Sequence, residues 1–110
     1  MLAQKYSAFP HLKHDHLELM VTCLSICSAC ASMCINEGHK ETAKLCIDCA
    51  DVCSLAIKLH NRESEFNQKI MHLCAAVCKR CSEECSKMKV EHCQQCAQIC
   101  KECARVCEKE

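Results

Sequence analysis

The stretch that decides the fold is CLSICSACASMC, residues 23–34, in which cysteines recur at intervals of four, three and four residues. An α-helix places residues three and four apart on one face, so this spacing puts the thiols in a single row. The spacing returns in LCIDCADVC (45–53), LCAAVCKRCSEEC (73–85) and HCQQCAQICKECARVC (92–107), and the four segments together contain all sixteen cysteines of the 110-residue chain. The sequence therefore predicts four helices, each with thiols along one side.

The rest of the composition also favours helices. The chain has one Gly and one Pro, which argues against a strand-and-turn fold. Pro10 fits a helix start, Gly38 a left-handed helix end and Ser64 a helix N-cap. We expect residues 1–110 to form a single all-α domain, an antiparallel up-down-up-down four-helix bundle with a Cys-lined core. The expected helices cover residues 11–36, 40–60, 65–87 and 90–108, with ends uncertain by about 2–4 residues.

The cysteines occupy the seam of each helix that faces the bundle axis. If Cys27, Cys46, Cys78 and Cys93 are heptad a positions, every cysteine falls at a or d. Neighbouring e and g positions are mostly apolar, and charges lie on the outer b, c and f positions. The candidate metal ligands are Cys23, Cys27, Cys30, Cys34, Cys46, Cys49, Cys53, Cys74, Cys78, Cys81, Cys85, Cys93, Cys96, Cys100, Cys103 and Cys107.

Packing alone does not explain cysteine at so many predicted core positions. One or two buried cysteines behave as small hydrophobes, but each Cys in place of Leu or Ile sacrifices roughly 1 kcal/mol of apolar burial. Disulfides within a helix are disfavoured because Cβ atoms three or four residues apart lie about 5–6 Å from each other, whereas a disulfide needs about 3.8 Å. Cross-helix disulfides stay open. Residues 1–20 lack the pattern of a secretory signal, so we expect a cytoplasmic location and reduced thiols.

Net charge gives no sign of a polyanionic partner. Fourteen basic and fourteen acidic side chains cancel, so we expect neither nucleic acid nor an acidic membrane surface as a partner. The first predicted helix has no charged residue from Leu19 through Asn36. This length is enough to span a membrane, but its thiol spacing matches the three more highly charged helices, and we interpret its outer face as a contact between subunits.

Thiolate-rich sites suit three kinds of metal: Cu(I), Zn(II) and iron–sulfur clusters. The spacing on helices without Gly differs from the looped cysteine pattern of ferredoxins. Sixteen thiols are enough for about four tetrahedral zinc sites, or for roughly one Cu(I) per cysteine if thiolates bridge. One Cu(I) replacing one proton per sulfur keeps the core neutral, whereas each zinc ion held by four thiolates buries two negative charges. We therefore favour Cu(I).

Softer ligands extend the seam beyond the cysteines. In an antiparallel bundle His16, Met20, His60 and Met71 lie toward one end, and we interpret them as a mouth through which Cu(I) enters. Equally, these Met side chains are typical gap-fillers, and His at a helix end is often solvated.

The remaining histidines are weaker candidates. Met88 and His39 lie toward the opposite end. His92, beside Cys93, is either an outer ligand or a surface residue. His11, His14 and His72 are expected on the surface.

These segments, above all HCQQCAQICKECARVC, resemble the bacterial copper storage proteins over nearly the whole chain after about residue 20. The resemblance implies a bundle that stores many Cu(I) ions, a homotetramer, and the cytosolic branch of that family. The predicted second helix departs from the other three in having only three cysteines.

The favoured function is storage or detoxification of Cu(I) by a protein that is not an enzyme, since CxxC here lacks the strand-to-helix setting of a thioredoxin-type site. The alternatives are a zinc or heavy-metal buffer with tetrahedral four-cysteine sites and a structural bundle with redox-active thiols. The residues do not identify a protein that receives the copper.

Overall fold

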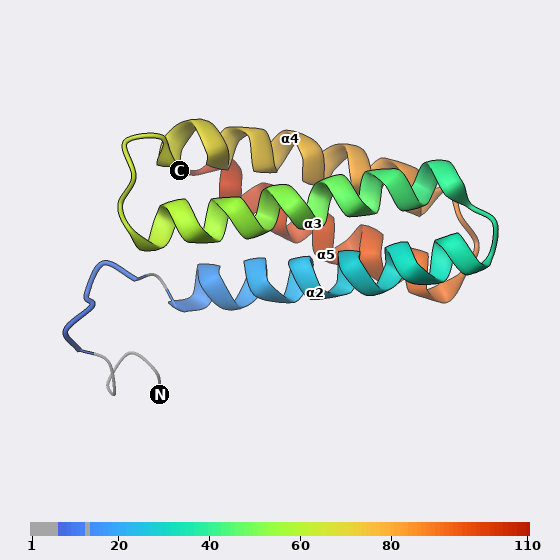
Figure 1. Cartoon of the computed structure of the whole chain (residues 1–110), viewed down its shortest axis with the longest axis horizontal. Coiled ribbons are helices and arrows are strands. Elements are labelled where there is room, and N and C mark those ends of the chain that lie inside the picture. Colours follow the sequence, from blue (N-terminus) through green and yellow to red (C-terminus); the bar gives the residue numbers. More distant parts are fainter. Residues whose placement is uncertain (1–6, 13) are drawn as a thin grey trace.

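The protein folds as an antiparallel four-helix bundle, as the sequence predicts. The computed structural model describes residues 7–12 and 14–110. Within these residues the helices run in the order α2 (His14–Asn36), α3 (Lys40–Asn61), α4 (Asn67–Ser86) and α5 (Glu91–Glu108), and the described part contains no strand (Figure 1).

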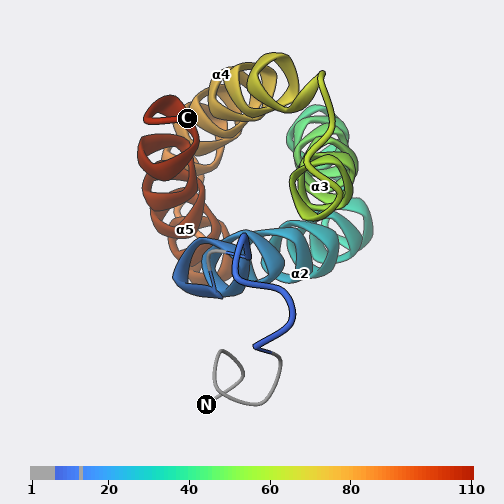
Figure 2. The same ribbon diagram turned by 90° about the vertical axis from the view of Figure 1, so that its left-hand side faces the viewer.

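Each helix packs against the next one along the chain, and α5 closes the ring by packing against α2 (Figure 2). Consecutive helices are antiparallel because the connections between them are short. The starts of α2 and α4 therefore lie at the same end of the bundle as the ends of α3 and α5 (Figure 1). All four helices turn one side toward a common axis.

The start of the first helix differs from the prediction. The sequence predicts a helix start near residue 11, with Pro10 close to it, whereas α2 begins at His14. Pro10 and His11 instead belong to a turn in which the Leu12 N–H donates to the Phe9 carbonyl at 3.2 Å. Proline suits such a turn as well as it suits a helix start.

The prediction for Gly38 is confirmed. Its φ of +84° is left-handed. The Gly38 N–H donates to the Ile35 carbonyl at 3.1 Å, and the His39 N–H donates to the Cys34 carbonyl at 2.8 Å. This pair of hydrogen bonds is a Schellman motif, which satisfies the last carbonyls of α2.

The end of α3 has the same motif without glycine. The Glu63 N–H donates to the His60 carbonyl at 3.1 Å and the Ser64 N–H donates to the Leu59 carbonyl at 3.0 Å, with Glu63 at a φ of 49°. Ser64 is not the N-cap of the next helix, because α4 begins only at Asn67. The Ser64 Oγ accepts the Phe66 N–H at 3.0 Å in a local turn instead.

The connection between α4 and α5 is held by a side chain that the sequence did not single out. The Gln94 Nε2 donates to the carbonyls of Ser86 and Met88. These two carbonyls lie at and just beyond the end of α4. A residue in the first turns of α5 thereby fixes a break that contains neither Gly nor Pro.

The predicted seam is the core. All sixteen cysteines are buried, and the most exposed, Cys30, is 2% accessible. Met20 and Met71 fill the core at one end, while small Ala side chains such as Ala43 and Ala56 lie among the thiols. The interior therefore consists mainly of sulfur and methyl groups, and Ile70 is its buried branched aliphatic side chain.

The outer face of α2 is unusually apolar. Val21 is 46% exposed, Met33 45% and Ile35 56%. Within the described residues, Asp15–Asn36 is the one helix long and apolar enough to cross a membrane, and 33% of its most apolar window is buried inside the bundle. Its cysteines belong to the shared core, which is the property of a packed helix rather than of an isolated span.

Replacing Glu63 by glycine should stabilise the protein. Left-handed backbone costs a residue with a Cβ atom about 1 kcal/mol, and glycine avoids this cost. We expect the free energy of unfolding of reduced Glu63→Gly, measured anaerobically by denaturant titration, to rise by about 1 kcal/mol. Arg62→Gly is the control, since Arg62 has a φ of −102° and glycine there only adds unfolded-state entropy. Equal effects of both changes would contradict the prediction.

Candidate metal centre

Thiols from different helices meet between two pairs of helices, α2 with α5 and α3 with α4. Between α2 and α5 the Sγ atoms of Cys27 and Cys100 are 3.4 Å apart, and those of Cys34 and Cys93 are 3.7 Å apart. Between α3 and α4 the cross-helix Sγ–Sγ distances are 3.5 to 3.9 Å, in the pairs Cys49–Cys78, Cys46–Cys85, Cys53–Cys74, Cys53–Cys78 and Cys46–Cys81. Neighbouring thiols on different helices are therefore in contact along the bundle.

Cys100 joins the two sets. Its Sγ lies 3.9 Å from that of Cys23 on α2 and 3.9 Å from that of Cys49 on α3. All sixteen cysteines are free thiols, and these distances are far longer than the S–S bond of about 2.05 Å. The arrangement is a network of separate sulfur atoms.

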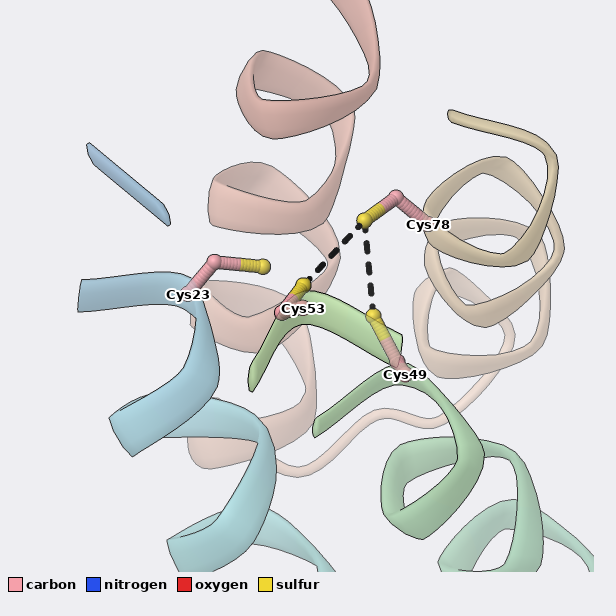
Figure 3. Close-up of side chains that lie close together, drawn as sticks. All are labelled: Cys23, Cys49, Cys53 and Cys78. Atoms are coloured by element: carbon pink, nitrogen blue, oxygen red, sulfur yellow. Dashed lines mark hydrogen bonds between the residues drawn. The ribbon is translucent and has the colours of Figure 1, made fainter. Parts of the chain in front are cut away.

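Groups of four ligands follow one another along the axis, and each group shares members with the next. Within a group, every ligand atom lies within 4.8 Å of the others. Figure 3 shows one such group, in which thiols from α2, α3 and α4 converge. Five of the groups are Cys23/Cys49/Cys53/Cys78, Cys23/Cys27/Cys49/Cys100, Cys27/Cys81/Cys96/Cys100, Cys30/Cys46/Cys85/Cys96 and Cys30/Cys34/His92/Cys93.

Cysteines that belong to two groups at once favour metal ions that share ligands. Isolated tetrahedral sites each need four thiolates of their own, but here Cys23 and Cys49 belong to two groups, as do Cys27 and Cys100. Metal–sulfur bonds of about 2.3 Å place sulfurs ~3.8 Å apart around a tetrahedral ion and ~4.0 Å apart around a trigonal one. The observed spacing fits ions that share bridging thiolates.

Burial sets the protonation of the outermost thiols. It is the main cause that raises the pKa of Cys34 to about 11, and it also raises the pKa of Cys93. Deeper in the core, the hydrogen bond between Cys23 and Cys100 lowers the pKa of the first and raises the pKa of the second. A thiolate at Cys23 is thus stabilised where the neighbouring Cys100 thiol keeps its proton.

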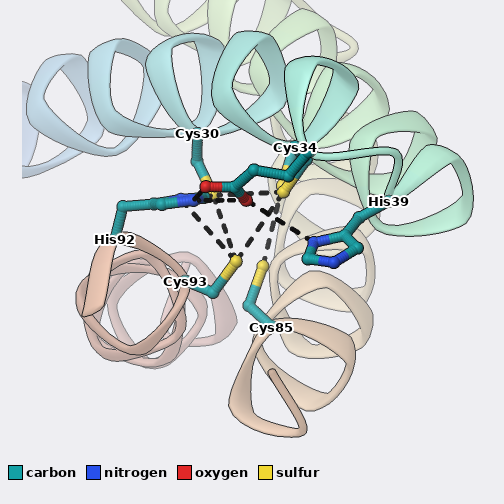
Figure 4. Close-up of polar contacts among 8 residues, drawn as sticks. Cys30, Cys34, His39, Cys85, His92 and Cys93 are labelled. Atoms are coloured by element: carbon teal, nitrogen blue, oxygen red, sulfur yellow. Dashed lines mark hydrogen bonds and ion pairs between the residues drawn. The ribbon is translucent and has the colours of Figure 1, made fainter. Parts of the chain in front are cut away.

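One end of the core is closed by a histidine. The Nδ1 atom of His92 lies 3.2 Å from the Cys30 Sγ and 3.6 Å from the Cys93 Sγ (Figure 4). Partial burial opposes a charge on this ring, but hydrogen bonds to Glu37 and Cys30 raise the pKa of His92 above its ordinary value. The ring lies close enough to the thiols to share a metal ion with them, and the role of His92 as an outer ligand stays a prediction.

His39 and Met88 also lie at this end. The His39 Nδ1 is 3.5 Å from the Glu37 carboxylate, and Met88 packs partly buried against the core. Sequence reasoning did not single out Glu37. The sequence places Glu37 directly before Gly38. This position indicates the end of a helix, but it does not indicate that Glu37 contacts a residue of α5.

The four residues interpreted as a mouth lie at the opposite end. Met20 and Met71 are 1% exposed and His60 is 8% exposed. The His16 Nδ1 lies 3.7 Å from a Glu110 carboxylate oxygen. Two methionines and two histidines thus occur where the thiol column ends, and their role in copper entry stays a prediction.

The three histidines that we expected on the surface do not share one environment. The His11 ring is not simply solvated, because its Nε2 is 2.9 Å from the carbonyl oxygen of Asn61 at the end of α3. His72 is exposed on α4, as expected. The side chain of His14 lies outside the described part of the chain.

Comparisons with known proteins agree with this geometry. The sequence model of the copper storage protein family matches residues 10–110. YhjQ, an uncharacterized cysteine-rich protein of Bacillus subtilis strain 168, is 37% identical over 81 residues, which are 70% of this chain and 75% of that protein.

Two solved structures have the same fold. The structure of Cu(I)-bound copper storage protein BsCsp3 is 33% identical with a TM-score of 0.82, over 87% of this chain and 94% of that one. The structure of apo-Csp3, copper storage protein 3 from Bacillus subtilis, is 35% identical with a TM-score of 0.83, over 89% of this chain and 97% of that one.

Fold and site together define a class: a four-helix bundle that binds metal through thiols in its own core. Within that class, the chain belongs to the copper storage protein family.

Proposed function

We propose that this protein stores Cu(I) by binding many ions along its interior, at roughly one ion per cysteine. The observation that carries the proposal is the series of four-ligand groups linked by shared thiols, five of which together contain thirteen of the sixteen cysteines. The sixteen cysteines are the ligands, and His92 adds a nitrogen ligand at one end.

Charge balance supports a monovalent ion. The described core contains no lysine or arginine, so a set of thiolates must be neutralised by the metal itself. Each Cu(I) that displaces one thiol proton leaves the charge of the core unchanged. A Zn(II) ion held by four thiolates leaves a net charge of −2 without a buried cation to balance it.

We also propose how the whole protein acts and where in the cell it lies. The protein acts by sequestering copper rather than by catalysis, since the thiols are buried among themselves. We place it in the cytoplasm, where thiols stay reduced. Storage and detoxification are both compatible with such a core.

The stoichiometry of metal uptake tests the function. Anaerobic titration of the reduced apo protein with Cu(I), against a competing chromogenic chelator, should end near one ion and one released proton per cysteine, roughly 16 of each. A parallel titration with Zn(II) should saturate at about four ions, and these should be displaced by Cu(I). An endpoint near four Cu(I), with zinc bound equally tightly, would instead identify a zinc buffer.

The mouth is tested by kinetics. Replacing His16 and His60 by Gln and Met20 and Met71 by Leu removes the softer ligands with small changes in volume. Cu(I) uptake followed by stopped flow should slow about tenfold, which corresponds to roughly 1.4 kcal/mol in the barrier, with no change in final capacity. A control variant that carries His72→Gln on the outer surface should load at the wild-type rate. Equal rates in both variants would rule out this entry route.

The exposed face of α2 supports a homotetramer. Three large apolar side chains, Val21, Met33 and Ile35, are about half exposed on a helix without charges in this stretch, and exposed apolar side chains on an uncharged helix support an interaction surface there. In sedimentation at micromolar concentration the protein should have four times the chain mass. Val21→Asp should dissociate it, because an unpaired charge is costly in an apolar contact. Leu73→Asp on α4 is the control and should leave the mass unchanged. A monomeric wild type would contradict the proposal.

A further inference from the structure

The His92 ring lies between a carboxylate and the thiols. On one side its Nε2 is 2.9 Å and 3.0 Å from the two carboxylate oxygens of Glu37. On the other side its Nδ1 faces the sulfurs of Cys30 and Cys93 (Figure 4). The His92 side chain is only 13% exposed, and that of Glu37 is 34% exposed. The carboxylate therefore lies on the rim of the bundle and the imidazole reaches inward from it.

The chemistry of the two partners determines where the ring carries its proton. An ionised carboxylate only accepts hydrogen bonds, so the Nε2 atom that contacts both oxygens of Glu37 must carry a hydrogen. In the neutral ring this leaves the Nδ1 lone pair directed at the thiols. A histidine binds a metal through an unprotonated nitrogen, and metal-bound histidines commonly donate the other ring N–H to a carboxylate.

The backbone fixes the carboxylate in this position. Glu37 is the last residue before the left-handed Gly38, and its own N–H donates to the Met33 carbonyl at 3.0 Å. The His39 Nδ1 lies 3.5 Å from the same carboxylate, on the α3 side. Glu37 is thereby held between a histidine at the start of α3 and a histidine in the first turn of α5.

We propose that Glu37 is a positioning residue, which holds His92 in the tautomer that can bind Cu(I) together with Cys30, Cys34 and Cys93. These four ligand atoms lie within 4.8 Å of one another. This inference rests on the proposed storage of Cu(I) and deepens it, because it assigns a mixed nitrogen and sulfur site to one end of the column. The carboxylate itself does not contact the ion.

Nitrogen NMR of the apo protein reads the tautomer directly. In 15N-histidine-labelled wild type, at a pH above the raised pKa of His92, long-range correlation spectra should show the neutral ring protonated at Nε2, and the Nδ1 resonance should shift when Cu(I) is added. In Glu37→Gln the amide can either accept from or donate to Nε2, so both tautomers should be populated. Glu91→Gln is the matched control. It removes a charge next to His92 from a side chain that accepts a hydrogen bond from Gln95, and it should leave the tautomer unchanged.

Competition with a chelator measures the consequence for binding. Loss of a carboxylate that orients a metal-bound histidine weakens metal binding about 10- to 100-fold, and we expect this decrease for one Cu(I) per chain in Glu37→Gln. The double variant Glu37→Gln/His92→Ala should bind Cu(I) as the single variant His92→Ala does, because Glu37 acts only through the ring. Glu91→Gln should match the wild type.

Three results would overturn the inference: an Nδ1 resonance that does not move on full loading, a Glu37→Gln variant with the wild-type tautomer and affinity, or an effect of Glu37→Gln that persists in the His92→Ala background. Each of these leaves a capacity of roughly one ion per cysteine intact, so each would remove the role of Glu37 without touching the storage function. A wild type that binds only a few ions would refute the storage function itself, whatever the state of His92.

Discussion

The cost of burying charge governs this molecule. An isolated thiolate in an apolar interior is strongly disfavoured, yet a metal-storing core needs a thiolate for each ion it binds. The protein meets both conditions by keeping the thiols protonated and in contact with one another until metal replaces the protons. The contacts of Cys23, Cys27 and Cys49 with Cys100 make this exchange possible, since a charge that forms on one sulfur is stabilised by hydrogen from the next.

The same constraint affects stability. A core of sulfur and methyl groups buries less apolar surface than one of leucine and isoleucine, so the apo bundle depends more heavily on its helices and their ends. Gly38 closes α2 without strain, while Glu63 closes α3 in a conformation that a side chain disfavours. Metal that binds only the folded state adds stability in proportion to the logarithm of its concentration. Copper is therefore also a structural component of the loaded protein.

The two ends of the bundle are chemically different. At one end Met20, Met71 and His60 continue the column with softer side chains that are themselves buried. At the other end the column finishes at Cys34 and Cys93, beside an imidazole held from outside by a carboxylate. Our two proposals assign copper entry to the end with thioethers and copper retention to the end with the oriented imidazole.

The sequence by itself determined the helices, the seam and the thiol column, because the spacing of cysteines three and four apart is a local property of an α-helix. It also identified Gly38 as a helix end. The pairing of sulfurs across helices, such as Cys27 with Cys100, and the bonding of Glu37 to His92 were decided only by the tertiary structure. Residues 55 positions apart in the chain meet through the packing and register of α2 against α5, which no local repeat specifies. For the same reason the row of thiols was predictable, but the contact of Glu37 with His92 was not.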